Sequence, residues 1–332
     1  MSEYLKKSRI VFVLRYLETL SDENHPLNAA DILNLLSKEG IFAERKAVYS
    51  DIEALREMGY DIIRKGGKLG GYYLKNRRFK LPEVSLLIDA VQSAEFIPSE
   101  KSRELVGKLE ELVSKNQAAE IKNRICIDNR NKCKNENVYY IIEDLSRAIN
   151  LKKKVKITYV RNLLTDKGVV PTEKQLLISP YALLWDADHY YLIGNNEKYD
   201  NLLHLRVDRI KSVEISRANF RHFSEVSEYS QRFDTADYAR KTFNMFGGEM
   251  CRIDLECDLS ALDQILDRFG NGIFIRRDTA RGVFRFAADA LISEGLIGWL
   301  MQFGDKVTVL SPESLKSDVK QRVMELFEKY SK

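Results

Sequence analysis

The sequence predicts a multidomain α+β protein, with an all-α N-terminal domain that ends in a basic hairpin, a small β-barrel in the middle and a ferredoxin-like domain at the C-terminus. Three observations carry this prediction. Three amphipathic helical patterns precede two β-prone runs beside glycines, short alternating runs follow, and strands and helices then take the order β-α-β-β-α-β. With 332 residues, about twice the length of one domain, the chain can hold several cores.

The overall charge is nearly balanced, with 53 basic and 49 acidic side chains. This excludes nucleic-acid binding through a uniformly basic surface, so a basic surface must be local. No apolar run approaches the roughly 18 residues of a membrane-spanning helix, and residues 1–4 lack the pattern of a signal peptide. We therefore expect a cytosolic protein without a membrane partner.

Cysteine spacing argues against a metal site. The four cysteines stand at positions 126, 133, 251 and 257, which match neither zinc-binding pairs nor redox motifs. Cys251 and Cys257 alternate in step with Ile253 and Leu255, so a strand would point all four into a core. We interpret the cysteines as structural thiols and expect neither a metal nor another cofactor.

Three helical patterns fill the first 60 residues. Apolar residues at helical spacing up to Leu20 predict the first helix, which the polar run at 21–26 ends. Asn28 can cap the second helix, and Gly40 suits its C-terminal end. The third pattern, over residues 44–58, has a polar face opposite its apolar one. That face carries Lys46, Tyr49, Ser50 and Glu53.

A cation-rich hairpin is predicted over residues 62–74, where two short β-prone runs flank glycines. Seven cations and no acid lie between positions 64 and 80, namely Arg64, Lys65, Lys68, Lys75, Arg77, Arg78 and Lys80. A polar helix face with a cation and a tyrosine suits a DNA major groove, and hairpin cations suit phosphates. We therefore predict a DNA-binding winged helix over residues 1–80; the alternative is a protein-binding module with solvated cations.

The candidate DNA contacts come from the third helix and the hairpin. They are Arg45, Lys46, Tyr49, Ser50, Arg64, Lys65 and Lys68. Residues 42–55 and the run Gly-Gly-Tyr-Tyr-Leu at 70–74 resemble the helix and wing of bacterial winged-helix repressors that carry a WYL domain. Members often have Ser or Thr at the position of Ala43 and Arg at that of Ser50. The resemblance therefore implies a lost helix-capping hydroxyl, a lost phosphate or base contact and an altered DNA preference.

The segment from 81 to 137 predicts a helical connector that ends in a polar linker. A helix of this kind could pair two chains, which would suit the two half-sites that a helix-turn-helix dimer reads. It could equally be a strut within one chain. The sequence leaves both alternatives open, and we expect a homodimer.

The middle of the chain predicts a small antiparallel barrel, because several short β runs follow the alternating residues Val155, Ile157 and Tyr159 within about 60 residues. Residues 178–194 and 205–210 resemble the WYL domain, and the resemblance covers about 138–225. The family's Trp-Tyr-Leu signature is Tyr190-Tyr191-Leu192 here. The resemblance implies an Sm-like, SH3-type barrel that senses nucleic acid or nucleotide-like molecules.

Cations and aromatic rings in this domain form a candidate ligand surface. In a strand over 202–208, His204 and Arg206 would face opposite to the leucines, and such groups suit phosphate-bearing ligands with stacking bases. The candidate ligand contacts are Tyr181, Tyr190, Tyr191, His204, Arg206 and Arg209. The alternative is that the tyrosines and Trp185 fill the core and that Asp208 forms a surface ion pair with Arg206 or Arg209.

Residues 240–332 predict the ferredoxin-like domain, followed by a last helix that Ser311 would cap. Residues 298–312 resemble the extension that commonly follows WYL domains, which implies roles in dimerisation and ligand control. A group of arginines on the predicted hairpin could form a second ligand surface or be solvated. They are Arg276, Arg277, Arg281 and Arg285.

The sequence lacks a pattern typical of an enzyme. Four histidines and no HExxH, GxSxG or phosphate-binding loop motif leave no nucleophile with its base and no metal with its ligands. We therefore expect a sequence-specific DNA-binding transcriptional regulator that is not an enzyme. Its expected partners are a double-stranded operator and a nucleotide or single-stranded nucleic-acid effector. The alternative is a nucleic-acid-binding accessory protein of a defence or DNA-repair system.

Overall fold

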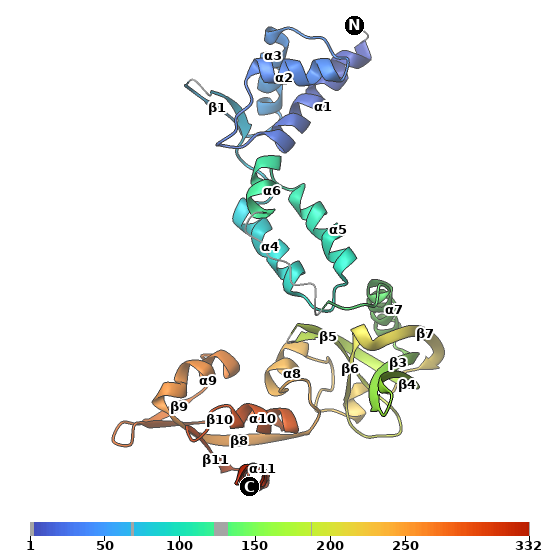
Figure 1. Cartoon of the computed structure of the whole chain (residues 1–332), viewed down its shortest axis with the longest axis vertical. Helices are drawn as coiled ribbons and strands as arrows, with labels where there is room; N and C mark the ends of the chain where they lie inside the picture. Colours follow the sequence, from blue (N-terminus) through green and yellow to red (C-terminus); the bar gives the residue numbers. More distant parts are fainter. Residues whose placement is uncertain (1–2, 68–69, 123–131, 187, 332) are drawn as a thin grey trace. The chain divides into compact units, whose positions relative to one another are not determined.

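The computed structural model describes residues 3–67, 70–122, 132–186 and 188–331. It divides into two compact units, residues 1–134 and 135–332 (Figure 1). Helices dominate the first unit, and the second combines helices with two antiparallel sheets. The predicted multidomain α+β class is therefore confirmed.

The first unit begins with the predicted order of three helices and a hairpin. These elements are α1 (Glu3–Leu20), α2 (Ala29–Lys38), α3 (Arg45–Glu57), β1 (Ile62–Lys65) and β2 (Gly71–Leu74). Asn28 caps α2 as predicted, since its side chain accepts from the N–H groups of Ala30 and Asp31. Gly40 follows α2 with a φ of 74°, a left-handed conformation that favours glycine. Local capping therefore fixes both ends of this helix.

The hairpin is held to the helices through its second strand. Tyr72 exchanges two backbone hydrogen bonds, of 2.7 and 2.9 Å, with Leu27 just before α2. A side chain at Gly71 would put its Cβ 2.6 Å from the Leu27 carbonyl oxygen, so only glycine fits this close approach. The glycine in the Gly-Gly-Tyr-Tyr-Leu run thus allows β2 to dock on the helices.

Three further helices complete the first unit. They are α4 (Leu81–Ser93), α5 (Ser99–Glu110) and α6 (Lys115–Lys122). Val84 and Ile88 of α4 are buried together with Ala118 and Ile121 of α6 in a separate small core. The connector is therefore helical, as predicted; positions 123–131 of the predicted linker, with Cys126, lie outside the described residues.

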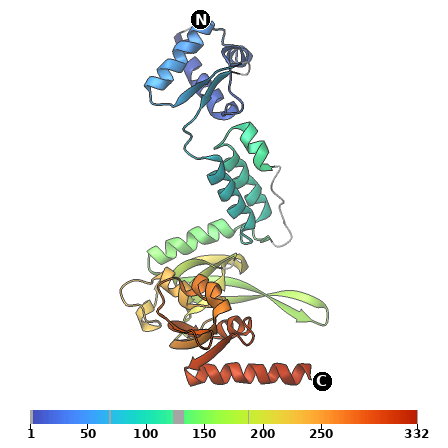
Figure 2. The same ribbon diagram turned by 90° about the vertical axis from the view of Figure 1, so that its left-hand side faces the viewer.

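The second unit starts with a helix and a five-stranded antiparallel sheet. The elements are α7 (Val138–Asn150), β3 (Lys153–Thr165), β4 (Gly168–Asp186), β5 (His189–Asn195), β6 (Leu203–Arg206) and β7 (Ile210–Asn219). Two runs that the sequence separates at Pro180 are one strand, because a register shift beside Pro180 lets β4 continue. The far parts of β3 and β4 form a long two-stranded arm (Figure 2).

The expected closed barrel is wrong. The strand order is β6-β5-β4-β3-β7, and no ladder joins β6 to β7 in the described part of the chain. Strand β6 has four residues, and a 3-10 turn at Val207–Arg209 then redirects the chain to β7, which pairs with β3. Helix α7 covers the open sheet with Val138, Ile141 and Leu145. A helix therefore closes the core that a strand pairing was expected to close.

The C-terminal elements follow the predicted β-α-β-β-α-β order. After α8 (Thr235–Lys241), they are β8 (Glu249–Asp258), α9 (Leu262–Phe269), β9 (Ile275–Asp278), β10 (Val283–Ile292), α10 (Glu294–Met301), β11 (Val307–Ser311) and the additional α11 (Glu313–Tyr330). The strands lie in the order β11-β8-β10-β9. Cys257 is fully buried and burial raises its pKa to about 12, whereas Cys251 is half-buried.

One predicted cap is wrong. Ser311 is the last residue of β11, and the capping position of α11 is Pro312, which forms no side-chain cap. Ser311 pairs with Asp254 of β8, so the residue that was expected to cap the helix is part of the sheet. The first turn of α11 carries an acid, Glu313, near the positive end of the helix dipole.

Candidate nucleic-acid interface and sensor surface

Helix α3 presents the predicted side chains on one exposed face. Arg45, Lys46, Tyr49 and Ser50 are all exposed, while Val48, Ile52 and Leu55 are buried on the opposite side. The capping position is Glu44, which forms no side-chain cap, and Ala43 packs against the core. The lost capping hydroxyl inferred for Ala43 therefore lies one residue before the cap. The Glu44 side chain therefore accepts from none of the backbone N–H groups of the first turn.

A buried ion pair fixes the orientation of α3. Arg9 of α1 donates two hydrogen bonds to Asp51 of α3, Nε to Oδ2 at 2.5 Å and Nη2 to Oδ1 at 2.9 Å. The two side chains are only 14% and 10% exposed. Sequence reasoning missed this pair, because 42 residues separate its partners. Bidentate geometry fixes both the distance and the rotation between the two helices.

The hairpin and α3 meet through aromatic contacts. The Tyr49 and Tyr72 rings lie 6.3 Å apart, and the Arg56 guanidinium lies 5.8 Å from the Tyr72 ring centre. Arg56 also donates to Glu53 at 2.6 Å and to the Ile62 carbonyl at 2.8 Å. Tyr49 therefore packs against the hairpin as well as facing outward. Glu53, an acid on this face, is paired with Arg56.

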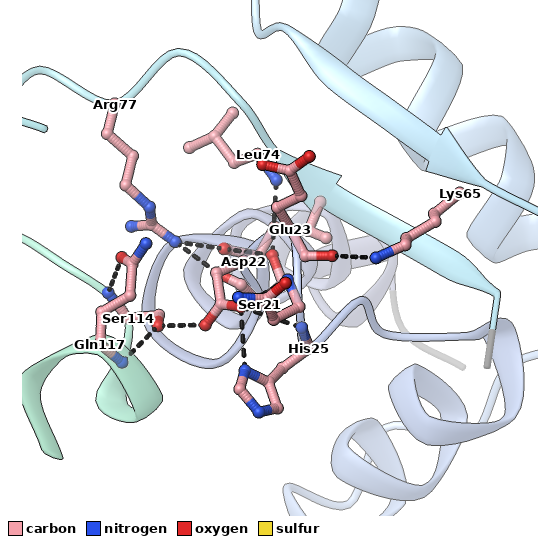
Figure 3. A network of polar contacts seen from close by, with 11 residues as sticks. Ser21, Asp22, Glu23, His25, Lys65, Leu74, Arg77, Ser114 and Gln117 are labelled. Carbon is pink, nitrogen blue, oxygen red and sulfur yellow. Dashed lines mark hydrogen bonds and ion pairs between the residues drawn. The ribbon is translucent and has the colours of Figure 1, made fainter. Parts of the chain in front are cut away.

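Most hairpin cations are exposed, but two are engaged by the protein. Arg64, Lys75, Arg78 and Lys80 are exposed in the described structure, and Lys68 lies outside the described residues. The Lys65 ammonium is exposed and donates to the Glu23 carbonyl at 2.7 Å (Figure 3). A phosphate could reach Lys65 only by sharing or replacing this contact.

Arg77 is turned into the protein. Its guanidinium donates to the carbonyls of Glu18 at 2.5 Å and Leu17 at 3.2 Å, at the C-terminal end of α1. It also donates to the Ser21 carbonyl at 2.6 Å (Figure 3). Burial lowers the pKa of Arg77. The inference that this arginine adds to a phosphate-binding surface is thus wrong, because its donors satisfy the last carbonyls of a helix.

In the second unit, the sheet brings Tyr191 and Arg206 together. They face each other across the β5–β6 ladder. Arg206 donates to Asp208 through Nε at 3.0 Å and Nη2 at 2.6 Å, and this hydrogen bonding raises the pKa of Arg206. Burial raises the pKa of Tyr191, which stays half-buried beside the ion pair. Arg209 lies exposed in the following turn.

The other candidate ligand residues lie apart from this pair. Tyr181 is 6% exposed among Phe220, Phe223 and Phe233, which leaves it little surface for a ligand to contact. Tyr190 follows the opposite face of β5 and packs against the core under α7. These two placements agree with the alternative in which tyrosines fill the core.

His204 is engaged within the protein. Its Nε2 lies 2.7 Å from the Tyr238 hydroxyl of α8, and the two rings stack at 5.7 Å. Burial lowers the pKa of His204 to about 4 and raises that of Tyr238 to about 12. His204 is therefore neutral at physiological pH and gives the surface no positive charge.

A basic residue that the sequence did not indicate lies near the five-stranded sheet. Arg268 of α9 donates to the Thr242 carbonyl at 2.5 Å and lies 4.1 Å from the Phe243 ring centre. Burial lowers its pKa, and burial raises the pKa of Asp186 at the end of β4, with which Arg268 interacts electrostatically. The residue links two domains that were predicted separately, so no local pattern could have identified it.

Two of the four C-terminal arginines are paired with a carboxylate. Arg281 and Arg285 both donate to Glu256, at 2.8 and 2.7 Å. Arg276 lies 5.8 Å from the exposed Phe274 ring, and Arg277 pairs with the buried Phe284 in the next strand, on the other side of the sheet. The four arginines thus do not form one positive surface.

Neither a membrane-spanning helix nor a metal-binding cluster occurs among the described residues. No helix in those ranges is long and apolar enough to cross a membrane. Likewise, within the part of the chain that the structure describes, no three His, Cys, Asp or Glu side chains are grouped to hold a metal ion. The polar clusters above are accordingly made of ion pairs, hydrogen bonds and ring contacts.

Comparison with known proteins finds two family models. The WYL domain model matches residues 140–215, and the WCX domain model matches residues 249–327. No curated protein matches the chain. The first match coincides with α7 and the five-stranded sheet, and the second with the four-stranded sheet and most of α11.

Among solved structures, proteasome accessory factor B/C (PafBC) of Arthrobacter aurescens is similar at 16% identity and a TM-score of 0.29, over 98% of this chain and 49% of that one. A CRISPR Cas-related protein is similar at 12% identity and a TM-score of 0.36, over 98% of this chain and 84% of that one. The chain therefore spans about half the length of the first of these. On the family models, this chain contains a WYL domain followed by a WCX domain.

Proposed function

We propose that this chain is a sequence-specific DNA-binding transcriptional regulator whose first unit is a winged helix and whose WYL domain senses a nucleotide or nucleic-acid ligand. One observation carries the proposal. The exposed face of α3 holds Arg45, Lys46, Tyr49 and Ser50 beside a hairpin whose cations Arg64, Lys75 and Arg78 are exposed. A helix face for base edges next to cations for phosphates is the arrangement that duplex recognition requires.

The sensing part of the proposal rests on Arg206 and Tyr191. A guanidinium paired with Asp208 can exchange that carboxylate for a phosphate, because both offer two oxygens to the same fork. The half-buried Tyr191 ring beside it offers a face for a base. No catalytic role is proposed for this surface.

Selection of duplexes from random DNA tests the proposal directly, followed by footprinting in cells. Enrichment of one sequence motif and a few promoter sites would support a regulator. Binding spread over the genome, or binding to RNA, would instead support the accessory protein of a defence or repair system. Failure to enrich any duplex would contradict DNA recognition altogether.

We expect Lys46→Ala and Tyr49→Ala to weaken binding to the selected duplex by about 1–3 kcal/mol each, where a base contact is lost. Fluorescence anisotropy on the selected and a scrambled duplex measures the effect, and only the selected duplex should lose this much affinity. The control is Lys320→Ala, which removes an exposed lysine from the other unit. If both α3 variants bind the selected duplex with wild-type affinity, α3 does not contact its bases.

We expect Arg206→Ala to lose the response to an effector while the protein stays folded. Nucleotides and short single strands that co-purify with the chain, identified by mass spectrometry, supply the probe; calorimetry should then show a loss of binding of at least about tenfold. Arg217→Ala, an exposed arginine in β7, is the charge-matched control. Equal binding by the wild type and Arg206→Ala would place the sensor surface elsewhere.

A further inference from the structure

A buried carboxylate joins the DNA-reading helices to the connector. Asp22 lies in the loop between α1 and α2 and is 3% exposed. Its Oδ1 accepts from the N–H groups of Asn24 and His25 and from His25 Nδ1, each at 2.9 Å, and its Oδ2 accepts from the Ser114 hydroxyl at 2.5 Å (Figure 3). All four of these groups donate to the carboxylate, as a buried anion requires.

Ser114, the partner of Asp22, also caps the start of α6. We call the Asp22–Ser114 contact the joint. It is fully buried, its hydroxyl accepts from the Gln117 N–H at 3.1 Å, and its own N–H donates to Gln117 Oε1 at 3.2 Å. This is a reciprocal capping box. The hydroxyl hydrogen remains for Asp22. One side chain therefore both starts α6 and attaches it to the loop after α1.

The residues on either side of Asp22 hold the hairpin. The Glu23 carbonyl accepts from Lys65 of β1 at 2.7 Å, and the Ser21 hydroxyl accepts from the Leu74 N–H of β2 at 3.4 Å (Figure 3). Arg77, just after β2, donates to the Ser21 carbonyl at 2.6 Å. A displacement of the loop at 21–25 would therefore displace both strands of the hairpin.

A second buried contact lies at the other end of the connector. Lys132 is 8% exposed, and its ammonium donates to the carbonyls of Val91 at 3.0 Å and Ala94 at 2.8 Å, at the C-terminal end of α4. The Cys133 N–H donates to the Glu95 carbonyl at 2.8 Å. The chain passes into the second unit at position 135, so its last residues in the first unit are pinned to α4.

We propose that the connector is a rigid strut and that Asp22 and Lys132 are the positioning residues through which the second unit controls the hairpin. Helices α4 and α6 share one packed core, and packed cores shift as blocks and do not deform gradually. The proposal rests on the proposed function, because it assumes that the hairpin contacts DNA. It states that the second unit acts on the hairpin by displacing the loop at 21–25.

Hydrogen exchange of the full chain, measured without DNA, tests the Asp22–Ser114 end of the strut. We expect Ser114→Ala to speed exchange about tenfold in the loop at 21–25 and in both hairpin strands, as well as in α6. Asp22→Ala removes the acceptor for the Ser114 hydroxyl together with the acceptor for the loop N–H groups, and should speed exchange in the same three segments. Ser93→Ala, an exposed serine in α4, should change neither region.

Lys132→Met tests the sensor end against Lys115→Met, which removes an exposed lysine at the start of α6. Only Lys132→Met should speed exchange at the end of α4 and, through the shared core, at 21–25. The proposal would be overturned if faster exchange stayed confined to α6 in Ser114→Ala, or to α4 in Lys132→Met. A contact that only caps its own helix would give that result.

Duplex binding separates this inference from the proposed function. In Ser114→Ala we expect affinity for the selected duplex to fall about tenfold and the slope of affinity against salt to become shallower, because the hairpin cations are no longer held. The proposal is overturned if Ser114→Ala speeds exchange in the loop at 21–25 and in the hairpin but leaves the duplex affinity and its salt dependence unchanged. In that case the second unit does not act on DNA binding through the hairpin. If the wild type binds no duplex, the proposed function fails, and the exchange pattern still decides whether the joint exists.

Discussion

Asp51→Ala should lower the free energy of unfolding of the first unit by about 3–5 kcal/mol, which is the usual cost of leaving one member of a buried ion pair without its partner. Arg9 would keep its charge at 14% exposure with no acceptor for its two donated hydrogen bonds. Both tryptophans, Trp185 and Trp299, lie in the second unit. The circular dichroism transition of the helical first unit should therefore shift, while the tryptophan fluorescence transition stays.

Replacing both partners sharpens this prediction. The double variant Arg9→Met with Asp51→Leu fills the same space with apolar groups and should regain most of the lost stability, because no charge remains buried. Glu53→Gln, which removes the exposed ion pair with Arg56 on the same helix, should cost under about 1 kcal/mol. If the double variant is as unstable as Asp51→Ala, a loss of packing and not an unpaired charge explains the effect.

The second unit should lose stability in acid through His204. Its folded-state pKa is about 4, against 6.5 for an unperturbed histidine. Because the folded pKa is depressed, the unfolded chain binds the proton more readily, so stability is fully present above pH 6.5 and falls as the pH drops to 4. Linkage gives a loss of about 3 kcal/mol at pH 4 from this group alone.

The matched variant is His204→Gln, which can still form a hydrogen bond with Tyr238 but does not titrate. Urea unfolding followed by tryptophan fluorescence at pH 7, 5.5 and 4.5 should show the wild type losing more stability than the variant with each step. All other titrating groups are common to both proteins, so their contribution cancels. Parallel stability curves would show that His204 accepts its proton in the folded state.

Local structure was largely predictable from the sequence. The Asn28 cap, the left-handed Gly40 and the exposed face of α3 all depend on residues within one or two turns of each other, so periodicity and capping chemistry suffice to place them. The β-α-β-β-α-β order was predictable for the same reason. Exposure of the α3 side chains is a property of the helix, whereas their contact with DNA stays a prediction.

Long-range pairings were not predictable. Closure of the expected barrel depended on whether β6 meets β7, which alternation within a strand does not specify. The Arg9–Asp51 and Asp22–Ser114 contacts join residues far apart in the chain, and Arg77 has the same composition signal as its exposed neighbour Arg78 although it faces the opposite way. Charge counts along a segment therefore overestimate the cations available to a phosphate.

The division of the chain at position 134 also has a consequence for synthesis. Among the described residues, each buried cluster belongs to one unit alone, so the clusters of the first unit draw all their side chains from residues up to 134. At about 5–20 residues per second, the remaining 200 or so residues take roughly 10–40 s to add. During that interval the nascent chain would hold a folded first unit before the second exists, so under the proposed function its DNA-binding part would precede its sensor.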